Sequence, residues 1–475
     1  MGHCVVLFDV YESTLNRTAG ILRVGHCVGL IRLLNMAASR HIRSKQVFRK
    51  AQPELFVGDI RDKLEEHSAA IWLKNNLHRL DLSEVKALFP VQGGVPYDPA
   101  RMLGIILLGV MVRVTSSRAL EDACRYDLRF MLVADNETPD YRTIGRFRAR
   151  LAPVIGALFT QVVRLAIEDG LVQLGRISID STKVASASSQ AKKWMKAATQ
   201  EDLDEDTQEP YSDPEAPVRK TSKGPLRGYT VQAAVDVDTG IVVAADVTTE
   251  ANDRLALGRM VEQIIEVTGA IPSEVLADRG YDTYEGHAQL EAQGIAGFIP
   301  PQTHEAGFWQ EADGQVVCPM GHPALPYSAR KERGRLIEVH QVRACPSCVL
   351  KASCCPRSRG RTLTVPAGVS PLPRIHAIWL NSTPAGDEAR RDRLGSVESV
   401  FGYLKWNCGS GRLTMRGKGK TRLEVLLHLM AKNLKRMVAA IFGLFSALFG
   451  LRMPPILIPL TSLSFVARSP TSRAA

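Results

Sequence analysis

The spacing of hydrophobic residues changes at Gly175, and this change constrains the fold more than any other feature of the chain. Before Gly175, hydrophobic residues recur with the period of a helix. After it, Ile177 and Ile179 alternate with polar residues, as in a half-buried strand. We therefore expect an all-helical domain over residues 41–169 and a mixed α/β domain over residues 170–440.

The helical part contains one segment, residues 99–112, that is apolar on nearly all sides and predicts a buried helix. Ser116 is placed to cap the next helix. A third helix carries Arg142, Arg146 and Arg150 at helical spacing on one face. Two short helices followed by a basic one fit a helix-turn-helix-like DNA reader. A helical bundle with a solvated arginine face fits the same spacing.

The mixed part reads as a strand, a hairpin, a helix, a strand, a helix, a short strand and a last helix. Two insertions interrupt it: a polar, acidic loop at 187–225 and a cysteine-rich segment at 301–385. Residues 1–40 lack a clear period and predict a poorly ordered extension, in which Met36 is an alternative start. Residues 441–475 form an apolar C-terminal tail.

Three carboxylates occur in contexts that suit metal binding. Asp180 ends the first alternating run, Asp278 ends a second strand-like run, and Glu398 lies on a predicted helix. Cleavage of a phosphodiester requires charge neutralisation on the attacking and leaving oxygens, and carboxylates hold the divalent cations that provide it. Each acid alone is more often structural, so the hypothesis of metal chemistry on nucleic-acid phosphates depends on their order along the chain.

Positive charge is concentrated around Glu398. Residues 327–440 contain 22 Lys and Arg but only 7 Asp and Glu. The net charge of this region, 22 − 7 = +15, exceeds the net charge of +11 of the whole chain. A solvated basic surface explains such a region, but a catalytic carboxylate inside it is also well placed to meet phosphate. The basic side chains that we expect to contact DNA phosphates here are Lys405, which lies seven residues after Glu398, and Arg416, Lys418 and Lys420 in a loop between two helices. Lys183 and Arg279 are phosphate contacts or surface ion-pair residues.

Five of the nine cysteines lie between Cys318 and Cys355. Cys345-Pro-Ser-Cys348 supplies a tight two-ligand turn, and Cys318 with Cys354, Cys355 or His322 completes a tetrahedral zinc site. Reduced structural cysteines are the alternative.

No segment predicts a membrane partner. The uncharged run from Met437 to Leu451 is short for a span and reads as a buried terminal helix. No convincing signal peptide opens the chain, so we expect a cytoplasmic, nucleoid-associated protein.

The sequence resembles the DDE transposases of bacterial insertion sequences, in the branch loosely grouped with IS-four and IS-five elements. The segments that carry the resemblance are Gly-Tyr-Thr-Val-Gln-Ala-Ala-Val-Asp236, Ala251-Asn-Asp253, Leu-Ala-Asp278-Arg-Gly-Tyr, Val-Glu398-Ser-Val-Phe-Gly-Tyr-Leu-Lys405, Ala431-Lys-Asn-Leu-Lys435 and the helical stretch from Tyr97 to Arg148.

This resemblance implies an RNase H-like core in which Asp180, Asp278 and Glu398 bind Mg²⁺ or Mn²⁺. It implies cleavage of double-stranded DNA at transposon ends and strand transfer into target DNA by a homodimer or higher multimer. The family often has Tyr and Arg upstream of the glutamate, where this chain has Arg391 and Leu394. An inactive DNA-binding remnant and a metal nuclease without strand transfer are the alternatives.

Overall fold

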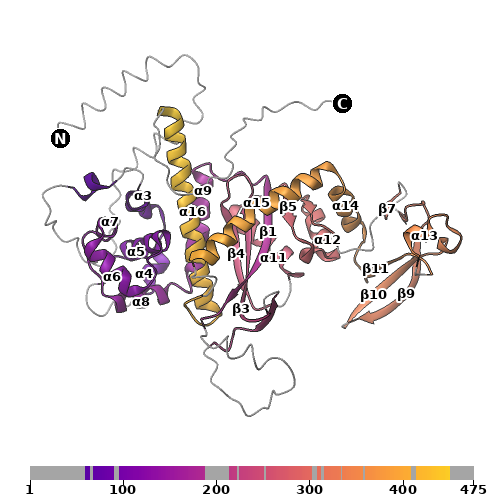
Figure 1. Cartoon of the computed structure of the whole chain (residues 1–475), viewed down its shortest axis with the longest axis horizontal. Helices are drawn as coiled ribbons and strands as arrows, with labels where there is room; N and C mark the ends of the chain where they lie inside the picture. The colour runs from indigo at the N-terminus through magenta and orange to yellow at the C-terminus, as the bar shows by residue number, and fades with distance from the viewer. Residues whose placement is uncertain are drawn as a thin grey trace, which may run out of the picture. The chain divides into compact units, whose positions relative to one another are not determined.

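The computed structural model describes residues 59–449 with gaps at 65–67, 90–95, 188–212, 222–223, 251–252, 302–307, 312–314, 333, 357–358 and 408–412 (Figure 1). The predicted extension at 1–40, including Met36, lies outside the described residues. So do most of the acidic loop and the tail beyond residue 449.

The first part of the chain is entirely helical in the residues described. Its elements are η1 (Ile60–Lys63), α3 (Ala69–Asn76), η2 (Leu77–Arg79), α4 (Ser83–Ala87), α5 (Pro99–Val112), α6 (Ser117–Tyr126), α7 (Leu128–Ala134), α8 (Tyr141–Arg150) and α9 (Ile155–Glu168). Helix α5 begins where the Asp98 carboxylate accepts a hydrogen bond from the Ala100 amide, with Pro99 in the first turn. Most of its residues are buried, which confirms the prediction of a core helix.

Helix α8 has the two faces that its sequence predicts. Ile144 and Phe147 are buried, whereas Arg142, Arg146 and Arg150 are exposed. Ser116 caps α6 by accepting a hydrogen bond from the Ala119 amide. These caps and faces agree with the sequence, and a helix-turn-helix role for the domain stays a prediction.

The second part is built on one mixed sheet. Its strands are β1 (Arg176–Ala185), β2 (Val218–Thr221), β3 (Gly224–Asp236), β4 (Val242–Thr248), β5 (Glu274–Ala277) and β6 (Ala296–Phe298). Strand β3 pairs with β1, β2 and β4 in antiparallel fashion, whereas β5 lies parallel to both β1 and β6. The path β4-β3-β1-β5-β6 is the RNase H-like order that the resemblance implies. At the β3–β4 turn, Gly240 adopts a left-handed conformation with φ of 69°.

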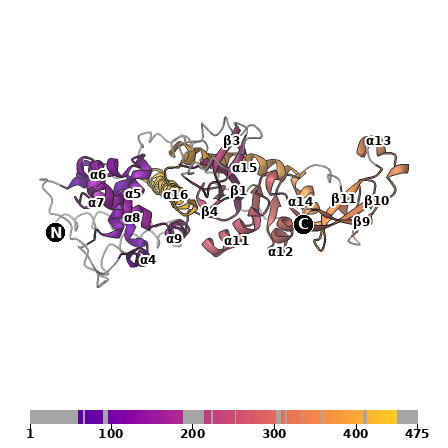
Figure 2. The same cartoon turned by 90° about the horizontal axis from the view of Figure 1, so that it is seen from below.

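Helices cover both faces of the sheet (Figure 2). Helix α11 (Ala256–Thr268) packs against β3 and β4, and α12 (Tyr284–Ala292) follows the short η3 (Arg279–Tyr281). Helix α15 (Pro384–Asn407) packs on the other face against β1 and β3. Its residues Val397, Phe401 and Leu404 are buried, as their spacing predicts.

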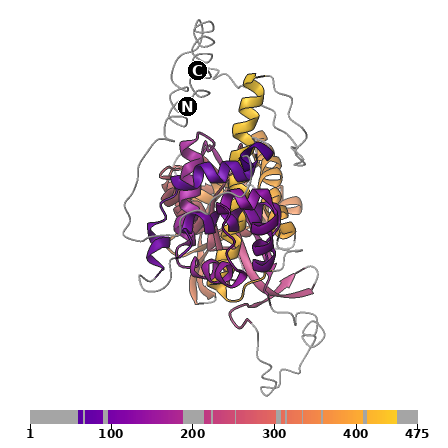
Figure 3. The same cartoon turned by 90° about the vertical axis from the view of Figure 1, so that its left-hand side faces the viewer.

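Helix α16 (Lys418–Phe449) joins the helical and mixed parts, since it packs against α5, α9 and β4 (Figures 1 and 3). Its buried Asn433 side chain bonds to both the N–H and the C=O of Val242, at 2.9 and 2.8 Å. These two bonds satisfy backbone groups of β4 on the side away from β3.

The cysteine-rich segment forms two small sheets, one of three strands in the order β11-β10-β9 and one of the two strands β7 and β8, with its own apolar cluster. Its elements are β7 (Trp309–Gln310), β8 (Val316–Val317), β9 (Ala324–Glu332), β10 (Arg335–Val342), η4 (Cys345–Ser347), α13 (Lys351–Cys354) and β11 (Thr362–Pro366). Helix α14 (Leu372–Asn381) follows these elements and packs against α12 and β6.

Four predicted boundaries are wrong. Asp180 lies in the middle of β1, because the strand continues to Ala185. Residues 218–221, placed in the acidic loop by their polarity, pair with β3 as β2. Lys418 and Lys420 begin α16 instead of lying in a loop, and this helix runs past residue 440 into the predicted tail.

Within the described ranges, no single helix is long and apolar enough to cross a membrane. Two sharply bent helix pairs, α5 with α6 and α8 with α9, reach the length and composition only when taken together.

Candidate active site

Strand register places Asp180 beside Asp278. Strand β1 pairs in parallel with β5 up to the partners Ile179 and Ala277, so the next residue on each strand is an aspartate. Parallel neighbours in register lie about 5 Å apart. The sheet itself therefore brings these two predicted acids together where β5 ends beside the middle of β1.

Asp180 is largely buried and engages two partners. Its Oδ1 accepts a hydrogen bond from the Ser181 amide at 2.7 Å, and its Oδ2 lies 3.1 Å from Arg393 Nη1. Burial raises the pKa of the Asp180 carboxyl to about 6, with the charges of Asp278 and Asp253 acting in the same direction. The Ser181 amide and Arg393 oppose this shift. Loss of contact with water, more than neighbouring negative charge, therefore disfavours the ionised form of Asp180.

Asp278 sits directly after β5 and caps η3. Its Oδ1 accepts a hydrogen bond from the Gly280 amide at 2.6 Å. A Cβ atom at position 280 would lie 2.8 Å from this same oxygen and 3.8 Å from Asp253 Oδ2. The distance to Asp278 is too short for a Cβ atom, whereas the distance to Asp253 is an ordinary van der Waals contact, so a side chain at position 280 would displace the Asp278 carboxylate.

Asp253 is a site residue to which the sequence assigned no role. It accepts hydrogen bonds from Ser181 Oγ at 2.9 Å and from Gln232 Nε2 at 2.5 Å. The buried hydroxyl of Tyr281 in turn donates to Gln232 Oε1. This network ties the loop after β5 to β1 and β3. The signal was present in the resembling segments, which contain Gln232, Asp253 and Tyr281, but spacing alone gave them no function.

Helix α15 reaches Asp180 through Arg393, not through Glu398. Glu398 is exposed and lies five residues further along the helix. In an α-helix that offset is about 7.5 Å along the axis and about 140° around it. Arg393 precedes the buried Val397 by four residues, so helical periodicity placed it on the sheet-facing side. The structure thus brings together two of the three predicted acids.

Among the residues that the structure describes, no three His, Cys, Asp or Glu side chains are arranged to hold a metal ion. The donor chemistry at Asp180 and Asp278 nevertheless fits a hard divalent cation, because carboxylate oxygens are its preferred ligands. The backbone at Gly280 also leaves the Asp278 carboxylate uncrowded by any side chain at that position.

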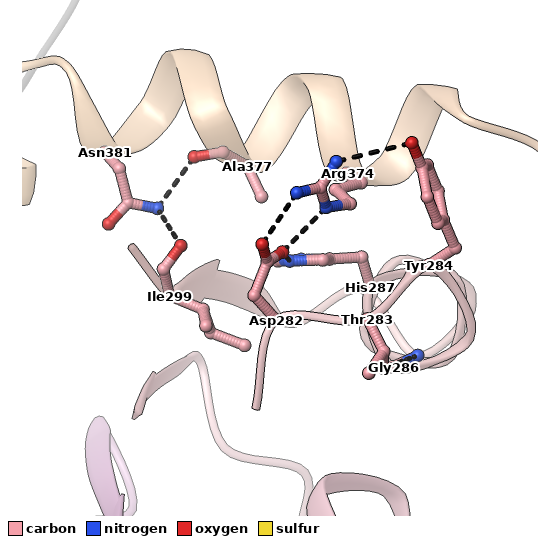
Figure 4. Close-up of polar contacts among 9 residues, drawn as sticks. All are labelled: Asp282, Thr283, Tyr284, Gly286, His287, Ile299, Arg374, Ala377 and Asn381. Atoms are coloured by element: carbon pink, nitrogen blue, oxygen red, sulfur yellow. Dashed lines mark hydrogen bonds and ion pairs between the residues drawn. The ribbon is translucent and has the colours of Figure 1, made fainter. Parts of the chain in front are cut away.

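A second polar network is centred on Asp282, four residues after Asp278 (Figure 4). Asp282 accepts two hydrogen bonds from Arg374 of α14, at 2.8 and 2.7 Å, and lies 3.0 Å from His287 Nε2. The side chains of Asp282, Arg374 and His287 are almost completely buried. Arg374 also lies 4.8 Å from the ring centroid of Tyr284. This network fastens α14, near the end of the cysteine-rich segment, to the loop that follows Asp278.

The predicted DNA-contacting side chains are all exposed. They are Lys183 on β1, Arg279 beside Asp278, Lys405 on α15, Arg416 before α16, Lys418 and Lys420 in its first turn, and Arg142 and Arg146 on α8. Exposure is compatible with phosphate contact, and their role stays a prediction.

The cysteines of the predicted zinc site line one small cavity, although among the described residues no three of them are arranged as metal ligands. Cys318, Cys345, Cys348, Cys354 and Cys355 surround it together with His322. Cys318 and Cys345 are buried, and Cys355 packs against the same cluster. Cys354 is exposed, with Arg361 Nη1 at 3.2 Å from its sulfur. Of the alternatives left open by the spacing, this packing favours Cys355 over Cys354.

Comparisons with known proteins match both parts of the chain. The family described as transposase DDE domain matches residues 317–438, and the transposase domain (DUF772) matches residues 61–150. No curated protein matches. Among solved structures, a cryo-EM structure of the piggyBac transposase synaptic complex with hairpin DNA is similar at 9% identity and a TM-score of 0.30, over 79% of this chain and 76% of that one.

The RNase H-like sheet and the DDE domain define a polynucleotidyl transferase of the endonuclease type. Each of the two parts thus matches a transposase domain, which supports a DDE transposase of an insertion sequence. The matched DDE segment contains Glu398 but neither Asp180 nor Asp278, so the site residues and the group of elements stay predictions.

Proposed function

We propose that Asp180 and Asp278 are the metal-binding acids of this DNA transposase and that Glu398 is the third. The observation that supports this most directly is the register of β1 and β5, which sets the two aspartates side by side. A bound Mg²⁺ or Mn²⁺ ion would neutralise charge on the scissile phosphate and favour ionisation of the attacking water. Glu398 joins the other two acids only if α15 shifts or turns when DNA binds.

Arg393 has two roles in this proposal. Its guanidinium neutralises Asp180 in the protein alone, at 3.1 Å. A guanidinium also binds phosphate oxygens in a bidentate manner. When the carboxylate takes another partner, Arg393 is placed to hold a DNA phosphate at the site. It thereby supplies a cation near where the family has arginine and this chain has Leu394.

The reaction that this site supports has two displacements at phosphorus. Water cleaves the phosphodiester at the transposon end and leaves a 3′ hydroxyl group. That hydroxyl attacks a target phosphodiester, so one P–O bond forms as another breaks. The chain's residues position the phosphates, and joining two ends to one target favours a homodimer or higher multimer on DNA.

The test is an incubation of the purified protein with Mg²⁺ and DNA carrying the inverted repeats that flank its gene. Joined products are expected from the native protein. Asp180→Asn and Asp278→Asn are expected to lower product formation at least 1,000-fold, equivalent to about 4 kcal/mol of transition-state stabilisation, while retaining DNA binding. Full activity of either variant would refute the assignment. Nicks without joining would refute strand transfer.

We also propose that the cysteine-rich segment binds one structural zinc ion through Cys318, Cys345, Cys348 and Cys355. This proposal is supported by the cavity that these side chains line and by the two-ligand turn at 345–348. Metal analysis should find one equivalent of zinc, lost in Cys345→Ser and kept in Cys124→Ser, a buried cysteine of the helical domain. Less than half an equivalent, with Cys345→Ser still folded, would contradict it.

A further inference from the structure

A partly open cavity of about 310 Å³ lies where the helical domain meets α16. Ile106, Val110 and Leu120 form its wall on the side of the helical domain. Leu413 and Leu427 form the opposite wall. Small-molecule sites occupy about 300–1,000 Å³, so this volume suits a single small ring system. The apolar walls favour a ligand with flat, weakly polar faces.

Polar atoms without partners gather at this cavity. Among the described residues, Arg148 Nε, Asn407 Nδ2 and His428 Nδ1 are buried and lack hydrogen-bond partners. All three residues line the cavity, and His428 is only 4% exposed. A buried polar atom left unpaired costs about 1–3 kcal/mol. Three such nitrogens beside one cavity therefore favour a ligand that presents hydrogen-bonding atoms on one edge.

The charge in the cavity favours a neutral ligand. Arg148 is the cationic lining residue, and the carboxylate of Glu424 lies near enough to interact with it. Both Glu424 oxygens already accept hydrogen bonds, from the amides of Thr414 and Met415. One cation and one anion cancel, so a phosphate dianion gains little here. A nucleobase combines apolar faces with nitrogen and carbonyl acceptors on its edge, and it is uncharged.

Features beside the cavity suit the sugar-phosphate backbone that a base would bring. Asn407 Oδ1 accepts a hydrogen bond from Arg113 Nε at 3.2 Å, and the Arg113 guanidinium lies 5.1 Å from the ring centroid of Trp406. Trp406 is 68% exposed, and Lys405 next to it is exposed as well. Arg113 ends α5 as a left-handed cap with a φ of 67°, and this cap fixes its backbone beside the cavity. Exposed aromatic and basic side chains together form the platforms on which unpaired nucleotides stack.

We propose that this cavity binds one unpaired base of the DNA substrate, with the backbone of that nucleotide lying over Arg113 and Trp406. The inference rests on the proposed action of this protein on DNA. It adds a nucleotide-binding site at the C-terminal end of α15, separate from the acids on the sheet. A paired base has no access to such a cavity, so the ligand is a base that has left the helical stack.

The test compares three DNA duplexes that differ at one point: fully paired, with a single adenine bulge, or with an abasic bulge. Fluorescence anisotropy at constant salt measures their affinity for the full-length protein. Stacking and edge contacts of one base strengthen binding by about 10-fold or more. The native protein should therefore bind the adenine bulge about 10-fold more tightly than the abasic bulge.

Asn407→Ala and Trp406→Ala should reduce this preference to less than about 3-fold, which is below one kcal/mol. Trp379→Ala is the matched control, because Trp379 of α14 is equally exposed at 68% and lies away from the cavity. It should keep the preference. Equal affinity of the native protein for the two bulged duplexes would overturn the nucleobase site. Failure to bind any of the duplexes would instead contradict the proposed function.

Discussion

His428 shows how one buried residue makes the protein sensitive to acid. Burial, and then the charge of Arg148, lowers the pKa of its imidazole to about 4, from an unfolded value near 6.5. The folded protein therefore binds fewer protons than the unfolded chain between these values. The contribution of His428 to stability is present above pH 6.5 and is lost as the pH falls towards 4. Over that interval the loss reaches about 3 kcal/mol.

His428→Gln should remove this part of the acid sensitivity. We expect the free energy of unfolding of the variant, measured in urea, to fall less between pH 6.5 and 4 than that of the native protein, by about 2–3 kcal/mol. His78→Gln, at an exposed histidine of the helical domain, is the control and should follow the native curve. Parallel curves for His428→Gln and the native protein would show that the imidazole is accessible to protons in the fold.

At the scale of elements, the network of Asp282 and Arg374 joins two helices to the loop that carries Asp278. Breaking a buried ion pair by removing one partner leaves an unpaired charge and costs about 3–5 kcal/mol. Asp282→Asn and Arg374→Met should each lower the free energy of unfolding by about this amount. The double variant should lose much less than the sum, because it leaves no unpaired charge.

A urea-denaturation cycle over these variants measures the coupling. Glu332→Gln supplies the control, since its ion pair with Arg330 on β9 is mostly exposed and is expected to contribute under about 1 kcal/mol. Additive losses at Asp282 and Arg374 would show that the pair does not act as a unit. Because the Asp282–Arg374 pair holds the loop that follows Asp278, we expect its loss to weaken catalysis more than DNA binding.

Periodicity predicted elements well where one face of an element is buried. The strand before Asp180, the buried stripe of α15 and the cap of α6 follow from local sequence, because burial and capping act over neighbouring residues. Strand β2 was not predictable in this way, because its residues are polar and are held in a strand only by pairing with β3. The predicted strand β1 also ended too early, at Asp180, because the residues that follow are polar. In the structure, pairing with β3 keeps β1 extended to Ala185.

The candidate site was predictable only in part for a similar reason. Asp180 and Asp278 end or interrupt hydrophobic runs and so stand out in the sequence. The role of Asp253 depends on contacts with Ser181 and Gln232 from other strands, which no spacing reveals. Helical spacing places Arg393 on the buried side of α15, but its ion pair with Asp180 depends on how the helix packs on the sheet and cannot be read from the sequence.

Over the whole molecule, positive charge is segregated towards the C-terminal half. Residues 327–440 contain 22 Lys and Arg against 7 Asp and Glu, while the full chain has 60 against 49. The rest of the protein is therefore slightly acidic. Such an uneven distribution orients a polyanion towards one part of the surface and makes its binding dependent on salt.

Arg416, Lys418 and Lys420 are the exposed cations in this region from which we expect the clearest salt effect. Each phosphate contact on duplex DNA contributes about 0.9 to the slope of log K against log salt concentration. Replacing all three residues by Gln should therefore reduce the magnitude of the slope by about 2–3. The control replaces Arg330, Lys331 and Arg335 of the β9–β10 hairpin, which removes the same charge. Two of these residues already pair with Glu332 and Glu285. This control should change the slope by less than about 1, and equal changes in the two triple variants would mean that net charge alone attracts the DNA.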